Sequence, residues 1–168
     1  SRYSFMLQPF EWMEAGFRYN SLSNRDFGVS TTNPDQSFKD KNFDVKFRLV
    51  QESAYKPALS LGFRDVAGTG LFSGEYLVAS KRVGALDFSL GAGWGSLGAG
   101  GGVTNPFKVL GDSFENRPNA SFGLGGTVDT NTFFKGPVAL FGGVQAQLPW
   151  EDWVLKLELE GNNYQSEP

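Results

Sequence analysis

The sequence predicts an all-β protein: an antiparallel up-and-down meander of about eight strands that forms a β-barrel or part of a larger one. Three observations carry this prediction. Apolar residues alternate with polar residues or Gly in eight segments, the connections between those segments alternate between short and long, and no segment has helical periodicity over three turns. The composition agrees, because the 168 residues include 22 Gly and 15% aromatic residues.

The first four strands are predicted at residues 3–8, 12–20, 42–51 and 58–65. In the fourth, Leu61 and Phe63 share one face and Arg64 lies on the other. A period of two places successive side chains on opposite faces of a strand, so each of these segments has one apolar face and one polar face.

The last four strands are predicted at residues 75–81, 86–94, 137–148 and 153–160. Segment 86–94 is the most informative, because large apolar residues alternate strictly with Asp, Ser and Gly before Trp94 ends the run. Its length is close to the ~9–11 residues that a tilted strand needs to cross a bilayer. Two segments depart from the pattern: 75–81 is apolar on both sides, and Phe141 interrupts the polar side of 137–148.

The connections differ in length in a regular order. Connections 9–11, 52–57, 82–85 and 149–152 are short, whereas 21–41, 66–74 and 95–136 are long. Successive connections of a meander emerge at opposite ends, so the short turns are predicted at one end and the long loops at the other. That asymmetry is typical of outer-membrane barrels, and Trp and Tyr near the strand ends fit an aromatic girdle. A soluble barrel or sandwich alternates equally well, and its aromatics would cover a core.

We expect residues 1–168 to form a single β-barrel domain with a long Gly-rich loop insertion at 95–136. Asn105 and Pro106 predict a turn or two of helix within this loop, which we expect to fold over or into the mouth of the barrel. The first and last strands both have their outer chain ends at the long-loop end, although outer-membrane barrels ordinarily keep both termini in the periplasm. The chain is therefore predicted to be a fragment of a longer protein.

Several function classes are disfavoured by composition. The net charge is -3 and the Lys and Arg residues are scattered, which argues against nucleic acid as a partner. The sequence has no Cys and no His, so it offers neither thiolate metal ligands nor the commonest general base. Residues 68–74 lack the Lys-Ser/Thr ending of a phosphate-binding loop, and Glu158 with Glu160 fits a solvated or salt-bridged face better than a catalytic pair. We expect no enzyme activity and no cofactor.

The polar faces of the predicted strands carry charges of both signs. In a barrel these side chains would face the lumen, and in a soluble sheet they would form its solvated outside. The charged candidates for a lumen-facing site are Arg18, Lys46, Arg48, Arg64, Asp87, Lys156 and Glu158.

Several stretches resemble the YjbH/GfcD family of exopolysaccharide and capsule biosynthesis proteins. They are residues 8–19 and 44–49, the block 58–98 with its Leu61-Gly62-Phe63-Arg64-Asp65 and Gly91-Ala92-Gly93-Trp94-Gly95 runs, and residues 136–144 and 162–164. The resemblance covers nearly the whole chain.

This resemblance implies an outer-membrane β-barrel protein of Gram-negative bacteria, often a lipoprotein, that takes part in exopolysaccharide or capsule secretion or assembly as a conduit or scaffold. Family members are several times longer, so the chain looks like an N-terminal portion. The implied partners are outer-membrane lipid, exopolysaccharide and other proteins of a polysaccharide export system. Glycan would contact the charged lumen and aromatics such as Phe72 and Trp94, and no catalytic residues carry over.

A different function stays open. The chain would then be a soluble periplasmic β-barrel or sandwich domain that binds a glycan or lipid-like ligand. In that case Phe43, Phe47, Leu86, Phe88 and Leu90 would point into a packed core, while Lys46 and Arg48 faced water.

Overall fold

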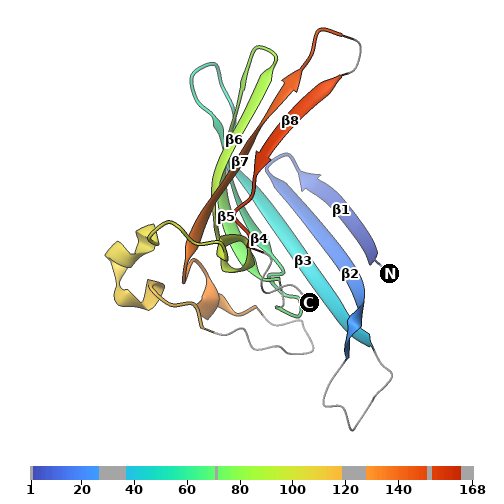
Figure 1. The fold of residues 1–168 in the computed structure, drawn as a ribbon, viewed down its shortest axis with the longest axis vertical. Coiled ribbons are helices and arrows are strands. Elements are labelled where there is room, and N and C mark those ends of the chain that lie inside the picture. The colour runs from blue at the N-terminus through green and yellow to red at the C-terminus, as the bar shows by residue number, and fades with distance from the viewer. Residues whose placement is uncertain (1, 27–36, 71, 119–127, 151–152, 164–168) are drawn as a thin grey trace.

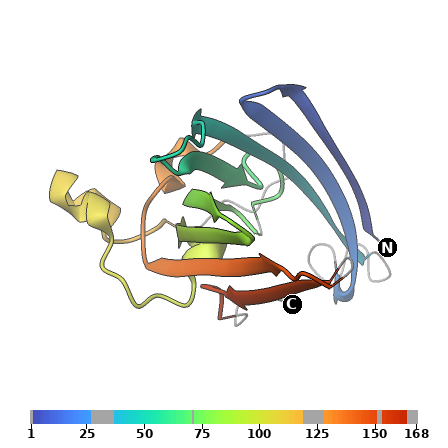
Figure 2. The ribbon, with the colours of Figure 1, turned by 90° about the horizontal axis from the view of Figure 1, so that it is seen from above.

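The structure, a computed structural model, describes residues 2–26, 37–70, 72–118, 128–150 and 153–163. They form one curved, open antiparallel sheet whose strands lie side by side in chain order (Figures 1 and 2). The eight strands are β1 Arg2–Phe10, β2 Met13–Asp26, β3 Ser37–Val50, β4 Ala58–Arg64, β5 Gly74–Val83, β6 Leu86–Trp94, β7 Val138–Gln147 and β8 Val154–Leu159. The predicted meander is confirmed, and β6 has the predicted bounds. Among the described residues, no helix is long and apolar enough to cross a membrane.

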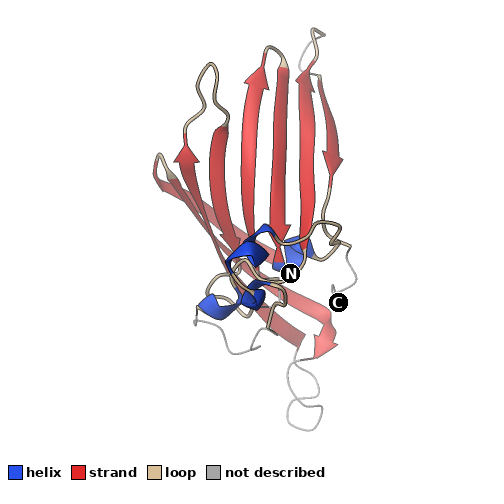
Figure 3. Cartoon of the chain, turned by 90° about the vertical axis from the view of Figure 1, so that its left-hand side faces the viewer, coloured by secondary structure: helices blue, strands red, loops and turns tan. Residues whose placement is uncertain are grey.

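The short and long connections lie at opposite ends of the sheet, as predicted (Figure 3). We call these the turn end and the loop end. At the turn end, β5 and β6 are joined by Gly84 and Ala85 alone, and Gly84 has the positive φ of 62° that such a tight turn favours. The sheet is not closed: in the described part of the chain β1 is hydrogen-bonded to β2 and β8 to β7, and their outer edges are unpaired. An open sheet of this curvature is compatible with part of a larger barrel.

The two faces of the sheet differ in chemistry because the alternation runs in register across all eight strands. Phe5, Phe17 and Phe43 face one another across β1, β2 and β3 on the apolar face. Trp94 belongs to this same face and packs on Phe107 of the long loop. The part of the loop that contains Phe107, drawn in yellow, lies outside the curve of the sheet in Figure 2. The apolar face is therefore convex and the polar face concave.

The convex face is largely bare. Phe88 is 43% exposed, Leu90 64% and Leu157 62%, and the buried hydrophobic residues of the described part are Trp94, Val138 and Ala139, close to the loop end. The side chains that a soluble sheet would bury thus meet no protein core over most of the strand length.

The long loop covers the loop end of this sheet (Figure 1). Its described part contains four short 3-10 helices: η1 Gly95–Gly98, η2 Pro106–Leu110, η3 Asp112–Phe114 and η4 Thr130–Thr132. The predicted helical turn after Asn105 is confirmed, since the Asn105 side chain accepts a hydrogen bond from the Phe107 N–H and Pro106 begins η2. Leu97 of η1 lies against the concave face, whereas η2 and η3 stand on the convex side.

Candidate functional site

A cavity of about 540 Å³ opens on the concave face across β4 to β8. We call it the groove. The charged, polar and aromatic residues of its lining are Arg64, Tyr76, Asp87, Ser89, Phe141, Gln145, Lys156, Glu158 and Glu160. Aliphatic residues also line it: Leu97 of η1, Val144, Leu157 and Leu159. Four of the charged residues predicted to share a site, Arg64, Asp87, Lys156 and Glu158, therefore line one cavity.

The strand register sets the spacing of the polar groups in the groove. Gln145 of β7 stands opposite both Asp87 of β6 and Lys156 of β8, which gives a row of acid, amide and base. One step further, Gly143 lies between Ser89 and Glu158 and supplies no side chain. Neutral residues on the middle strand thus keep the charges of the two outer strands apart and leave space between them.

Two aromatic rings form the floor of the groove near the loop end. Tyr76 and Phe141 are in edge contact, with ring centroids 6.2 Å apart and planes at 78°. Each ring lies over a glycine of a neighbouring strand: a Cβ built on Gly62 would come within 2.4 Å of the Tyr76 ring, and one on Gly91 would be 2.4 Å from Phe141. The glycines therefore let both rings lie close to the sheet instead of filling the groove.

The other half of the concave face, across β2 and β3, holds two ion pairs. Arg18 is 3.0 Å from Asp44, and Lys46 is 3.2 Å from Glu14. The two predicted site residues Arg18 and Lys46 are therefore engaged with neighbouring strands and lie outside the lining of the groove. Arg48, the next concave-face residue of β3, is exposed and also lies outside it.

Neither predicted aromatic contact lines the groove. Phe72 lies half-buried in the β4–β5 connection, where its N–H donates to Asp65 and its carbonyl accepts from the Ser96 hydroxyl. Trp94 is 3% exposed and stands on the apolar face, where its ring is tilted against that of Phe107 and meets that of Phe134 edge-on, with centroids 5.6 and 5.3 Å apart. The prediction that Trp94 faces a lumen is wrong, because its position in the alternation puts it with Leu90 rather than with Asp87.

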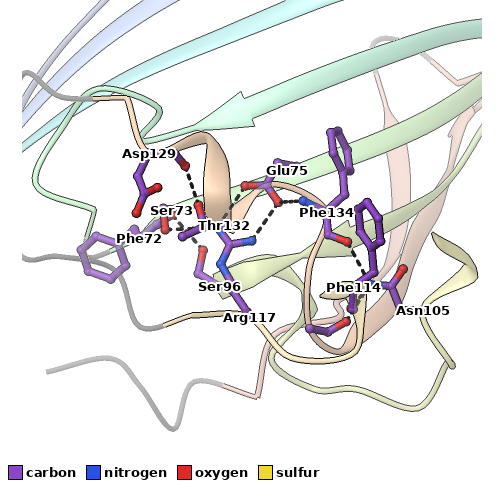
Figure 4. A network of polar contacts seen from close by, with 11 residues as sticks. Phe72, Ser73, Glu75, Ser96, Asn105, Phe114, Arg117, Asp129, Thr132 and Phe134 are labelled. Atoms are coloured by element: carbon purple, nitrogen blue, oxygen red, sulfur yellow. Dashed lines mark hydrogen bonds and ion pairs between the residues drawn. The ribbon is translucent and has the colours of Figure 1, made fainter. Parts of the chain in front are cut away.

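A buried polar network fastens the long loop to the sheet (Figure 4). Glu75 is 2% exposed and its carboxylate is 2.8 Å from Arg117. The same carboxylate accepts the Phe134 N–H, and the Asn105 amide donates to the carbonyls of Phe114, Phe134 and Gly136. Burial of a charge is favourable only when it is paired and hydrogen-bonded, so this network fixes the loop in one place.

Carboxylates gather where β3 and β4 reach the loop end. Asp40 is fully buried and accepts hydrogen bonds from Asn20, Asn42 and Thr69, while Asp44 accepts the Asp65 N–H. Burial raises the pKa of the Asp65 carboxyl to about 7, and the nearby carboxylates of Asp40 and Asp44 add to the rise. In the described part of the chain, no group of three or more His, Cys, Asp or Glu residues is placed to hold a metal ion.

Comparison with known proteins gives a family for this fold and groove. The family described as "Exopolysaccharide biosynthesis protein YbjH" matches residues 1–168, the whole chain. The chain belongs to the YjbH family. Within it, the "Uncharacterized lipoprotein YjbH" of Escherichia coli (strain K12) is 48% identical over 166 residues, which make up 98% of this chain and 24% of the relative. The chain thus spans about a quarter of that relative, and no solved structure matches it.

The site residues that sequence reasoning missed in this YjbH-family groove are Tyr76, Phe141 and Gln145. Phe141 did give a signal, since it interrupts the polar side of its strand. Tyr76 gave none, because its segment is apolar on both faces. The polar groups of the groove can donate and accept hydrogen bonds, and its two rings offer apolar surface, a combination that suits a ligand with hydroxyl groups and apolar edges.

Proposed function

We propose that this chain forms part of the wall of an outer-membrane β-barrel that takes part in exopolysaccharide secretion or assembly, as a conduit or scaffold. The observation that carries the proposal is the contrast between the two faces: the convex face is apolar and bare, and the concave face is polar and grooved. A monomeric soluble protein rarely exposes a contiguous apolar patch larger than about 300–600 Å². Acyl chains of lipid are the natural cover for such a face.

The groove supports exopolysaccharide as the ligand. A sugar ring has apolar C–H faces and a rim of hydroxyl groups, so it can lie on an aromatic ring while its rim bonds to polar side chains. Tyr76 and Phe141 supply the aromatic surface, and Asp87, Gln145 and Lys156 supply donors and acceptors beside it. The family description, which names exopolysaccharide biosynthesis, agrees with this ligand class.

The open edges support a larger barrel. β1 and β8 each present unpaired backbone groups along their outer edge, and an exposed strand edge invites pairing with another strand. The E. coli relative is about four times as long as this chain. In our proposal further strands of a longer polypeptide pair with both edges and close the wall in the Gram-negative outer membrane.

The proposed role is not catalytic, and other proteins of a polysaccharide export system would act with it. The sequence contains no His and no Cys, and Glu158 and Glu160 project from the same face of one chain segment rather than across a cleft. Binding and passage of a polymer require only weak, repeated contacts, which a row of spaced polar groups supplies.

The test removes the aromatic floor of the groove. We expect Tyr76→Ala combined with Phe141→Ala, in the full-length protein, to weaken binding of exopolysaccharide roughly tenfold or more, because each lost ring contact is worth ~1 kcal/mol. Calorimetry on detergent-solubilised protein measures the affinity, and staining of surface polysaccharide in a deletion strain carrying the variant reports the function. Tyr55→Ala is the matched control, since Tyr55 lies in the turn 51–57 and is 97% exposed.

Two results would contradict the proposal. Unchanged affinity in the double variant would remove the groove as the binding site. A wild-type protein that is a monodisperse monomer without detergent would favour the soluble periplasmic domain instead.

A further inference from the structure

Residues 105–117 of the long loop form a projection that we call the knob, and its tip is apolar. Val109 is 89% exposed and Leu110 is 70% exposed, both at the end of η2. Figures 1 and 2 show η2 and η3 standing away from the convex side of the sheet at the loop end. Two aliphatic side chains at the end of η2 are thus held in solvent.

The base of the knob is fixed by buried contacts. The ring of Phe107 packs against that of Trp94, and its centroid lies 5.9 Å from that of Phe114. Asn105 is 6% exposed and donates to three carbonyls, and Arg117 pairs with the buried Glu75. These aromatic and polar contacts hold the short segment in place on the sheet.

The knob carries one ion pair on its surface and one further exposed charge, the carboxylate of Asp112. Lys108 is 2.6 Å from Glu115, and the hydrogen bond to that carboxylate raises the pKa of Lys108. The pair joins η2 to the residue after η3. Charged groups can stay in the polar headgroup layer of a membrane while aliphatic side chains of the same segment reach the acyl boundary below it.

We infer that the knob is a membrane-interface anchor, in which Val109 and Leu110 enter the boundary between lipid headgroups and acyl chains next to the convex face. The inference rests on the proposed function, because it takes lipid to cover the bare side chains of that face. A protein partner explains the knob less well than lipid does. A stable protein interface buries about 800 Å² on each partner, far more than two aliphatic side chains offer. A membrane-interface segment needs to enter the headgroup and acyl boundary by only ~5–10 Å.

Introduced cysteines can test the anchor, because residues 1–168 contain none. The full-length protein is labelled with an environment-sensitive fluorophore at Leu110→Cys and reconstituted into vesicles of phosphatidylethanolamine and phosphatidylglycerol. Leu90→Cys, 64% exposed on β6, is the reference for lipid contact with the sheet, and Tyr55→Cys at the turn end is the aqueous reference. Nitroxide-labelled lipid quenches probes in the bilayer, and iodide quenches probes in water.

We expect the Leu110 probe to be quenched by shallow nitroxide lipid and shielded from iodide at least about twofold relative to the Tyr55 probe, as interfacial burial requires. A lipid-exposed Leu90 probe with an aqueous Leu110 probe would overturn the anchor and leave the barrel proposal standing. Aqueous emission at both positions would overturn both. A lipid-exposed Leu110 probe with an aqueous Leu90 probe would support the anchor and contradict the barrel.

Discussion

The two halves of the concave face carry similar residue types and use them differently. Across β2 and β3, Arg18 and Lys46 each form an ion pair with a carboxylate of the neighbouring strand. Across β6 to β8, Asp87 and Lys156 line an open groove with an amide between them. We call the half across β2 and β3 the paired half, because its charged side chains form ion pairs between strands. We call the half across β6 to β8 the groove half, because a ligand can reach its side chains.

The difference lies in which residues occupy the neighbouring strand. Glu14 and Lys46 are direct cross-strand partners, so opposite charges meet at contact distance. β7, with the sequence VALFGGVQAQ, carries no charge at all, and its concave face offers Phe141, Gly143 and Gln145. The uncharged β7 therefore separates Asp87, which is 3.9 Å from Arg82 of β5, from Lys156 of β8.

The largest predicted effect is a change of folding stability with pH, and it comes from Asp65, which lies near Asp40 and Asp44 at the loop end of β3 and β4. Asp65 is protonated up to a pH of about 7 in the folded protein and only up to its ordinary pKa of 3.8 when unfolded. Folding stability should therefore fall as the pH rises between these values, by up to ~4 kcal/mol, and level off above them. Asp65→Asn, which resembles the protonated form, should flatten this slope and stabilise the protein at pH 8.

Urea unfolding of the full-length protein from pH 4 to pH 8 measures the slope. Asp112→Asn is the control, because Asp112 is an exposed carboxylate of the long loop and should leave the slope unchanged. Parallel slopes for the wild type and Asp65→Asn would show that Asp65 is not the titrating group.

The next effect separates the two halves directly. Asp44→Ala removes the acceptor of both the Arg18 guanidinium and the Asp65 N–H, and should cost ~3 kcal/mol of unfolding free energy because partly buried donors lose their partner. Glu158→Ala, on the exposed groove half, should cost less than about 1 kcal/mol. The midpoint of urea unfolding measures both. Equal losses of unfolding free energy in the two variants would mean that the ion pairs of the paired half stabilise the protein no more than the groove residues do.

The strands could be predicted because a period of two is a local property of the sequence. Segment 86–94 was predicted residue for residue, and its polar positions Asp87 and Ser89 do line the cavity. Arg64, Lys156 and Glu158 were placed on the right face for the same reason. Which charges form pairs depends on the register between strands, and alternation within one strand contains no information about that register.

The positions of the two aromatic rings in the groove also depend on the register between strands, which alternation within one strand does not predict. Tyr76 lies over Gly62 and Phe141 over Gly91, so each ring depends on a glycine of a neighbouring strand. Trp94 has a residue type that suits a sugar site, but the alternation along β6 places it with Leu90 on the apolar face, away from the groove.

The smallest effect is also the most direct test of the role of β7. Gln145→Glu places a carboxylate opposite Lys156 without changing side-chain size, so the two can form a cross-strand pair like that of Glu14 and Lys46. The same carboxylate stands opposite Asp87 of β6, and repulsion between the two acids offsets part of the gain. Stability should change by no more than ~0.2–1 kcal/mol, the usual worth of such a pair. Polysaccharide affinity should fall severalfold, because Lys156 is then held in an ion pair with β7.

Gln147→Glu is the matched control. Gln147 lies on the same face of the same strand, nearer the turn end and outside the groove, so this variant should bind polysaccharide as the wild type does. Equal affinities for both variants would show that the uncharged face of β7 is not what keeps the groove open.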